Sequence, residues 1–221
     1  MTSDLKARIL ANARATPSST RGSSHLHAWL VLPSSIIVAA ALFFAFDGLH
    51  HGRGRTPWFF WASCVGWAAV AALSMWGAFA RGRSAIGRSR ALLLAVALGT
   101  PALLFAMMFG LAGAHPEVTF VHPERIGFKC LGLTVAAAVF PLVALALVRQ
   151  GSDPVHPVAT GAALGSACGA SAGVMVEMWC PVANPQHVVV GHIAPIVLMA
   201  ILGANLGARL IAMRARAPRG S

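Results

Sequence analysis

The chain has 221 residues, of which 57% are hydrophobic and 10% are charged, and its mean hydropathy is +0.71. It has too little polar surface for a water-soluble domain, so we expect it to lie in a lipid bilayer. The formal net charge is +11, from 17 Lys and Arg residues against 6 Asp and Glu residues. A nucleic-acid-binding protein would gather these residues on one polar face. Here they occupy short gaps between apolar runs, which argues against direct nucleic-acid binding and indicates membrane topology.

Residues 1–27 carry a short amphipathic pattern before the first apolar run. Ser3 can cap a helix, Asp4 complements its positive end, and Pro17 with the polar residues after it ends the helix in a flexible tether. An isolated helix this short is marginally stable, so we expect it to become ordered on a partner protein or on the anionic inner leaflet. The predicted partner-binding residues are Leu5, Arg8, Ile9, Leu10 and Ala13.

Apolar runs long enough to cross a bilayer occupy most of the remaining chain. They predict an all-α membrane protein, a bundle of six transmembrane helices within residues 28–213, followed by a basic tail over residues 214–221. No stretch outside them is long enough for a separate soluble domain, so we expect no enzyme activity of a conventional kind. The six runs are Ala28–Phe46, Trp58–Ala80, Ala91–Ala114, Cys130–Val148, Val158–Trp179 and His192–Met213.

The basic residues are divided unequally between the two sides of this predicted bundle. Both termini and the second and fourth connections hold 13 of the 17 Lys and Arg residues. Cytoplasmic loops are enriched in these residues, so both termini are predicted to be cytoplasmic. The first run starts only at residue 28 and is too long for the apolar core of a signal peptide, so we expect it to be retained. The four basic residues on the outer side are Arg53, Arg55, Arg125 and Lys129.

Glycine recurs at every fourth position of the fifth run, which places these residues on one face of a helix. A face without side chains lets two backbones approach closely, and this compensates for the missing hydrophobic drive between helices in lipid. The fifth run is therefore predicted to lie at the centre of the bundle, with Gly203 and Gly207 of the sixth as a counterpart. The predicted packing residues are Gly161, Gly165, Gly169 and Gly173.

Two of the four cysteines share the predicted outer level of the membrane. Cys130 opens the fourth run and Cys180 follows the fifth, whereas Cys64 and Cys168 fall inside their runs and are predicted to be core residues. The space outside a bacterial inner membrane is oxidising, which would allow a disulfide between Cys130 and Cys180.

Further polar residues gather around Cys180 and form the predicted signal-sensing region with Cys130. They are Glu177, His187 and His192, and the candidate metal ligands are Cys180, His187 and His192. Thiolate, imidazole and carboxylate ligands suit zinc, although the spacing C-x6-H-x4-H is not a standard zinc pattern. Three interpretations stay open: a metal site, a redox-active cysteine pair, and interfacial polar groups hydrated by water.

Glu177 is costly near the membrane unless it is paired, which favours a functional role. It lies close enough to the end of its run to reach water, so a structural role is equally consistent with the sequence. Phosphate-binding loops, H-E-x-x-H and C-x-x-C are absent from the sequence. No cofactor is therefore required.

Four segments in the second half of the chain are distinctive: GFKCL at residues 127–131, EMWCP at 177–181, GHIAP at 191–195 and GANLGAR at 203–209. Through these segments the chain resembles the NrsF-type family of six-span bacterial anti-sigma factors. The N-terminal segment is similar to the head of myxobacterial members, which include carotenoid regulators of the CarR type. Light or singlet oxygen is therefore one possible setting.

The resemblance implies a protein that holds an extracytoplasmic-function sigma factor at the bacterial inner membrane and releases it on an envelope or oxidative signal. It also implies that Cys130 and Cys180 take part in the response. Two other classes stay open: a small membrane protein that handles metal or thiol redox equivalents, and a structural subunit of a membrane complex. Bound metal, thiol turnover or a stable membrane partner would distinguish them.

Overall fold

A computed structural model describes residues 55–79, 88–117, 126–150 and 155–212, together with the single helical positions Ile37, Ala41 and Ala45. These residues form a bundle of long helices without a β-strand, and five segments are long and apolar enough to cross a membrane. The predicted all-helical class is confirmed for this part of the chain. The predicted first span, Ala28–Phe46, and the predicted residues 1–27 and 214–221 lie outside it, apart from the three single positions.

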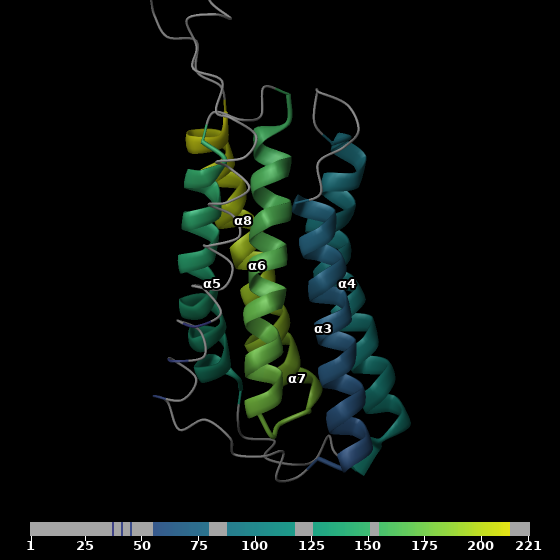
Figure 1. Ribbon diagram of the computed structural model, residues 1–221. Helices are drawn as coiled ribbons and strands as arrows, with labels where there is room; N and C mark the ends of the chain where they lie inside the picture. The colour runs from purple at the N-terminus through teal and green to yellow at the C-terminus, as the bar shows by residue number, and fades with distance from the viewer. Residues whose placement is uncertain are drawn as a thin grey trace, which may run out of the picture.

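The helices follow one another as antiparallel crossings of the bundle (Figure 1). Four predicted runs match observed helices to within a few residues. The elements are α3 (Pro57–Phe79), α4 (Arg90–Ala114), α5 (Phe128–Val148), α6 (Pro157–Trp179), α7 (Pro185–Val188), η2 (Val189–Ile193), α8 (Ala194–Leu206) and η3 (Gly207–Ile211).

The last crossing begins earlier than the sequence predicts. The segment from α7 to η3 is continuous from Pro185 to Ile211, so the predicted start at His192 is wrong. The cause is a helix start that hydropathy does not detect. The Asn184 side chain accepts a hydrogen bond from the His187 backbone N–H at 2.8 Å, and Pro185 occupies the first helical turn. His187 therefore lies in a helix and not in a loop.

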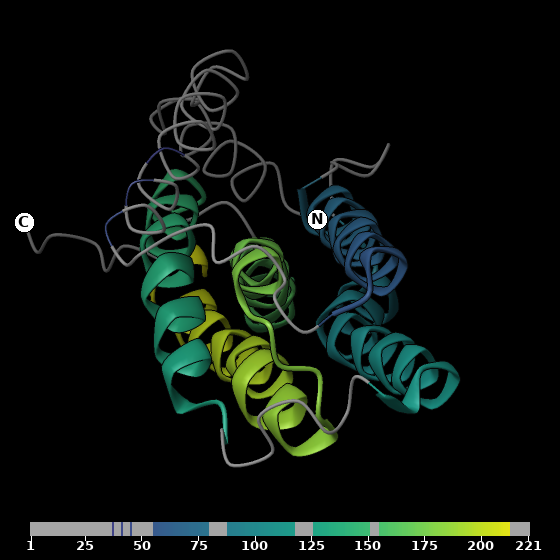
Figure 2. The same cartoon turned by 90° about the horizontal axis from the view of Figure 1, so that it is seen from below.

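Helix α6 occupies the centre of the bundle, with α5 and α8 on one side and α3 and α4 on the other (Figures 1 and 2). Its glycines lie where the neighbouring helices come closest. Gly161 faces Gly203 and Gly207, Gly165 faces the Met199 backbone, and Gly169 faces Ile196. The fourth glycine, Gly173, contacts the Trp67 ring of α3 instead, so the glycine face serves two neighbouring helices.

Large apolar side chains cover the outside of the bundle, as expected for a surface that contacts lipid. At the start of α3, Trp58 and Trp61 are exposed, which is the position of the aromatic belt at a membrane boundary. At the same end, the Lys129 ammonium lies 4.9 Å from the centre of the Trp179 ring. This end of the bundle is where the polar residues converge. Other exposed apolar residues include Val65, Leu73, Leu98, Leu103, Phe140, Leu147 and Ile201.

Candidate functional site

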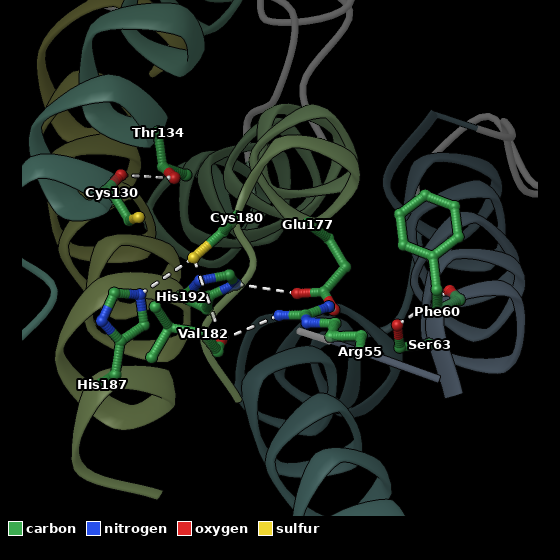
Figure 3. A network of polar contacts seen from close by, with 10 residues as sticks. All are labelled: Arg55, Phe60, Ser63, Cys130, Thr134, Glu177, Cys180, Val182, His187 and His192. Atoms are coloured by element: carbon green, nitrogen blue, oxygen red, sulfur yellow. Dashed lines mark hydrogen bonds and ion pairs between the residues drawn. The ribbon is translucent and has the colours of Figure 1, made fainter. Parts of the chain in front are cut away.

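Four buried ligand-type side chains meet at the end of the bundle that carries α7. One nitrogen or sulfur atom from each lies within 4.8 Å of the corresponding atoms of the other three. Figure 3 shows these thiols and imidazoles converging on one point. We call Cys130, Cys180, His187 and His192 the thiol–imidazole cluster. Their exposed fractions do not exceed 3%, so the cluster is closed to solvent.

The cysteines reach the cluster from two antiparallel helices. Cys130 lies in the first turn of α5, and Cys180 is the residue at which α6 ends. Since α5 and α6 run in opposite directions, these two positions fall at the same end of the bundle. Cys130 and Cys180 therefore lie at the same level of the bundle, as the sequence predicts. All four cysteines of the chain are free thiols, and Cys64 and Cys168 are buried elsewhere.

A contact between two backbones holds the start of α5 against the last crossing. Gly127 has φ +103°, which only glycine adopts without strain, and a Cβ there would lie 2.8 Å from the His187 carbonyl oxygen. Gly191 fills the opposite side of the contact, where a Cβ would lie 3.1 Å from the Cys130 Cβ. These two glycines let Cys130 approach the histidines.

A π-helical turn brings the two histidines onto one face. Residues five apart in an α-helix point about 140° away from each other, because each residue turns the helix by about 100°. His187 and His192 are separated by this interval, but the π-helix η2, Val189–Ile193, lies in the segment that joins them. Its wider turn brings His192 back over His187, so that the ring centroids are 5.4 Å apart.

A buried ion pair supports the cluster from the side of α3. The Arg55 guanidinium donates to Glu177 Oε1 and, at 2.8 Å, to the Val182 carbonyl oxygen. Glu177 Oε2 in turn lies 2.9 Å from His192 Nδ1, within ion-pair distance. Both charged side chains are fully buried, so the alternative in which Glu177 reaches water is wrong. Glu177 thus links Arg55 to the cluster (Figure 3).

The sequence pattern places Arg55 in an outer loop and does not predict its role in the site. The signal that could have found it is the acidic residue itself, since a buried carboxylate requires a cation. Only four basic residues were predicted on that side, namely Arg53, Arg55, Arg125 and Lys129. Proximity to the start of α3 favours Arg55, because it lies two residues before Pro57, where this neighbour of α6 begins.

The two thiols of the cluster are not equivalent. A hydrogen bond from the Cys130 thiol lowers the pKa of the Cys180 thiol. Burial opposes this effect, and the nearby His187 and His192 rings reinforce it. His187 Nε2 lies 3.1 Å from Cys180 Sγ. Cys180 is therefore the group that most readily carries thiolate character, which both metal ligation and attack on an oxidant require.

The predicted partner-binding residues cannot be compared with this geometry. Leu5, Arg8, Ile9, Leu10 and Ala13 lie outside the described residues. By contrast, all five predicted sensing residues fall in one connected group, with Glu177 beside the four members of the cluster.

Comparison with known protein families gives a match over most of the chain. The family described as negative regulator of sigma F, NrsF, matches residues 11–212. Searches of curated proteins and of solved structures gave no match.

Proposed function

The chain belongs to the NrsF family of negative regulators of sigma F, and from this membership we propose that it is a membrane anti-sigma factor without enzyme activity. It holds an extracytoplasmic-function sigma factor at the bacterial inner membrane and so represses transcription. The observation that carries this proposal is the family match, which extends over nearly all of the chain and includes every described helix. The apolar bundle supplies the anchor for the bound partner.

We assign the capture of the sigma factor to the N-terminal segment, residues 1–27. With the first span at residues 28–46, the bundle has six crossings and both termini in the cytoplasm, where a sigma factor is available. The amphipathic segment then supplies an apolar face of Leu5, Ile9, Leu10 and Ala13 for a groove on the partner. Its positive charge serves binding to the inner leaflet in the absence of the partner.

Capture is tested by co-purification of the sigma factor with full-length protein from membranes. Ile9→Asp places a charge on the predicted apolar face, and we expect at least about a tenfold loss of captured sigma factor, because the carboxylate would be desolvated in the groove. Ala11→Asp adds the same charge on the opposite face and serves as the matched control. Equal recovery with both variants would refute docking through this face, and a chain lacking residues 1–16 should capture nothing.

We assign the perception of the signal to the opposite end of the bundle, at the thiol–imidazole cluster and Glu177. In this topology the cluster lies at the oxidising side of the inner membrane. Oxidants and singlet oxygen that arise there under envelope stress can react with thiols. Helix α6 then joins the cluster to the cytoplasmic side, since it ends at Cys180 and packs against α3, α4, α5 and α8.

Cysteine variants test this assignment through a reporter for the sigma-dependent promoter. We expect Cys130→Ser and Cys180→Ser each to change induction by an oxidant several-fold, because each removes one of the two neighbouring thiols. Cys64→Ser and Cys168→Ser are the controls, since both residues are buried but lie outside the cluster, and they should leave induction unchanged. If all four variants respond like the parent, the thiols have no part in sensing.

A second candidate function is a small membrane protein that transfers metal or thiol redox equivalents. The observation that favours it is the buried group of four ligand-type side chains. A protein that only binds a sigma factor does not require such a group. Turnover of metal or thiol by purified protein without any bound sigma factor would establish this function instead.

A further inference from the structure

We propose that Cys130, Cys180, His187 and His192 form a tetrahedral site for a resident Zn²⁺ ion. The site is additional to the proposed function and does not depend on it. The cluster supplies the four ligands of a structural zinc site, in the common combination of two thiolates and two imidazoles.

The geometry of the cluster matches what Zn²⁺ requires. A tetrahedral ion with ligands at about 2.0–2.3 Å holds its ligand atoms roughly 3.3–3.8 Å apart. The four candidate atoms already lie within 4.8 Å of one another, and His187 Nε2 lies 3.1 Å from Cys180 Sγ. The candidate atoms therefore already lie close to the separations that a tetrahedral ion imposes.

A second observation, at His192, also points to a bound metal ion. His192 is fully buried, and its Nε2 atom has no hydrogen-bond partner among the described residues. Because Nδ1 faces the Glu177 carboxylate, Nε2 is left for the cluster. A buried imidazole nitrogen without a partner is costly, and a metal ion would satisfy it.

The surroundings have the arrangement that accompanies metal-bound histidines. Such histidines usually present their second ring nitrogen to a carboxylate, which fixes the ring and raises its basicity. Glu177 occupies this position at 2.9 Å from His192 Nδ1, and Arg55 holds Glu177 in place. Glu177 and Arg55 are positioning residues in this assignment.

The charges of the assembled site also balance. Two thiols lose their protons when Zn²⁺ binds, so two thiolates neutralise the ion, while Arg55 and Glu177 neutralise each other. A net charge of zero suits a site that is buried at the end of an apolar bundle.

The ligand set selects the metal. Mixed sulfur and nitrogen ligands in a tetrahedral arrangement favour Zn²⁺, whereas Mg²⁺ and Ca²⁺ prefer oxygen and Cu²⁺ prefers a planar arrangement. The π-turn explains why the sequence spacing is unfamiliar, because it lets histidines five residues apart act as neighbours.

The test uses full-length protein purified in detergent without a histidine tag. We expect inductively coupled plasma mass spectrometry to measure one Zn²⁺ ion per protein chain. After replacement by Co²⁺, we expect the absorption of thiolate-bound tetrahedral cobalt. Cys130→Ser and Cys180→Ser should each weaken this thiolate band and lower the affinity by at least about tenfold, whereas Cys64→Ser and Cys168→Ser should change neither. Glu177→Gln should retain the thiolate band and lower the affinity by about 10–100-fold.

The site is refuted if the folded parent protein takes up neither Zn²⁺ nor thiolate-bound Co²⁺. It is also refuted if the double variant Cys130→Ser/Cys180→Ser retains as much Zn²⁺ as the parent. Sigma-factor capture is measured on the same preparations. Capture without metal overturns only the zinc site, and metal without capture overturns only the proposed function.

Discussion

Glu177→Ala should destabilise the bundle by about 3–5 kcal/mol, because it leaves the Arg55 guanidinium buried without its counter-ion. Arg55→Met should have a similar effect by leaving the Glu177 carboxylate buried. Each side chain is fully excluded from solvent, so water cannot replace the missing partner. The measurement is unfolding in detergent micelles, followed by tryptophan fluorescence, with a chelator present so that bound metal does not contribute to stability.

The double variant Arg55→Met/Glu177→Ala tests whether the two residues contribute to the unfolding free energy jointly or independently. Removal of both charges leaves no unpaired ion, so the double variant should be less destabilised than the sum of the single changes. Glu117→Ala is the control, because that carboxylate is exposed at the same end of the bundle and contacts His115. We expect the control to change the unfolding free energy by less than about 0.5 kcal/mol. Additive single effects would show that Arg55 and Glu177 are not coupled.

This coupling bears on the cluster as well as on stability. Arg55 precedes α3, Glu177 lies in the last turn of α6, and His192 lies in the last crossing, so one chain of contacts joins three elements. The Val182 carbonyl, which also accepts from Arg55, belongs to the segment that connects Cys180 to α7. Loss of Arg55 would therefore release the connection that carries both Cys180 and His187.

The sequence predicted these features to different extents, for physical reasons. Membrane crossings and the glycine face depend on local patterns, namely hydropathy and a period of four, and both can be read along the chain. The common level of Cys130 and Cys180 followed from antiparallel crossings. These predictions required only helix length and direction.

The remaining features depend on contacts that a local pattern does not contain. The pairing of Arg55 with Glu177 joins residues 122 positions apart. The π-turn at Val189–Ile193 changes the direction of His192 without a signal in hydropathy. The early helix start at Pro185 depends on one capping side chain, Asn184, and moved His187 from a predicted loop into a helix. The sequence therefore grouped the four members of the cluster in one region, but it did not contain the geometry that brings their ligand atoms together.

Gly165→Ala should destabilise the bundle by about 1–3 kcal/mol, since the added methyl group has no space between α6 and α8. A Cβ at Gly165 would overlap the Met199 carbonyl, which is backbone and cannot rotate away. The two helices would have to separate, and α6 contacts α8 more extensively than any other element. Unfolding of the purified protein in micelles measures the loss.

Alanine substitutions at two further glycines should lower the stability of the bundle less than Gly165→Ala does. A Cβ at Gly169 would lie 3.0 Å from the Ile196 Cα, so Gly169→Ala should cost less than Gly165→Ala. Gly99 in α4 has no atom within 4 Å of an added Cβ, and Gly99→Ala should leave stability unchanged or raise it by up to about 1 kcal/mol through its helix propensity. Equal effects at Gly165 and Gly99 would show that close backbone approach does not hold α6 in place. The expected order, with the largest loss at Gly165, would show that the close α6–α8 contact contributes to the stability of the bundle that carries Cys180 and His192.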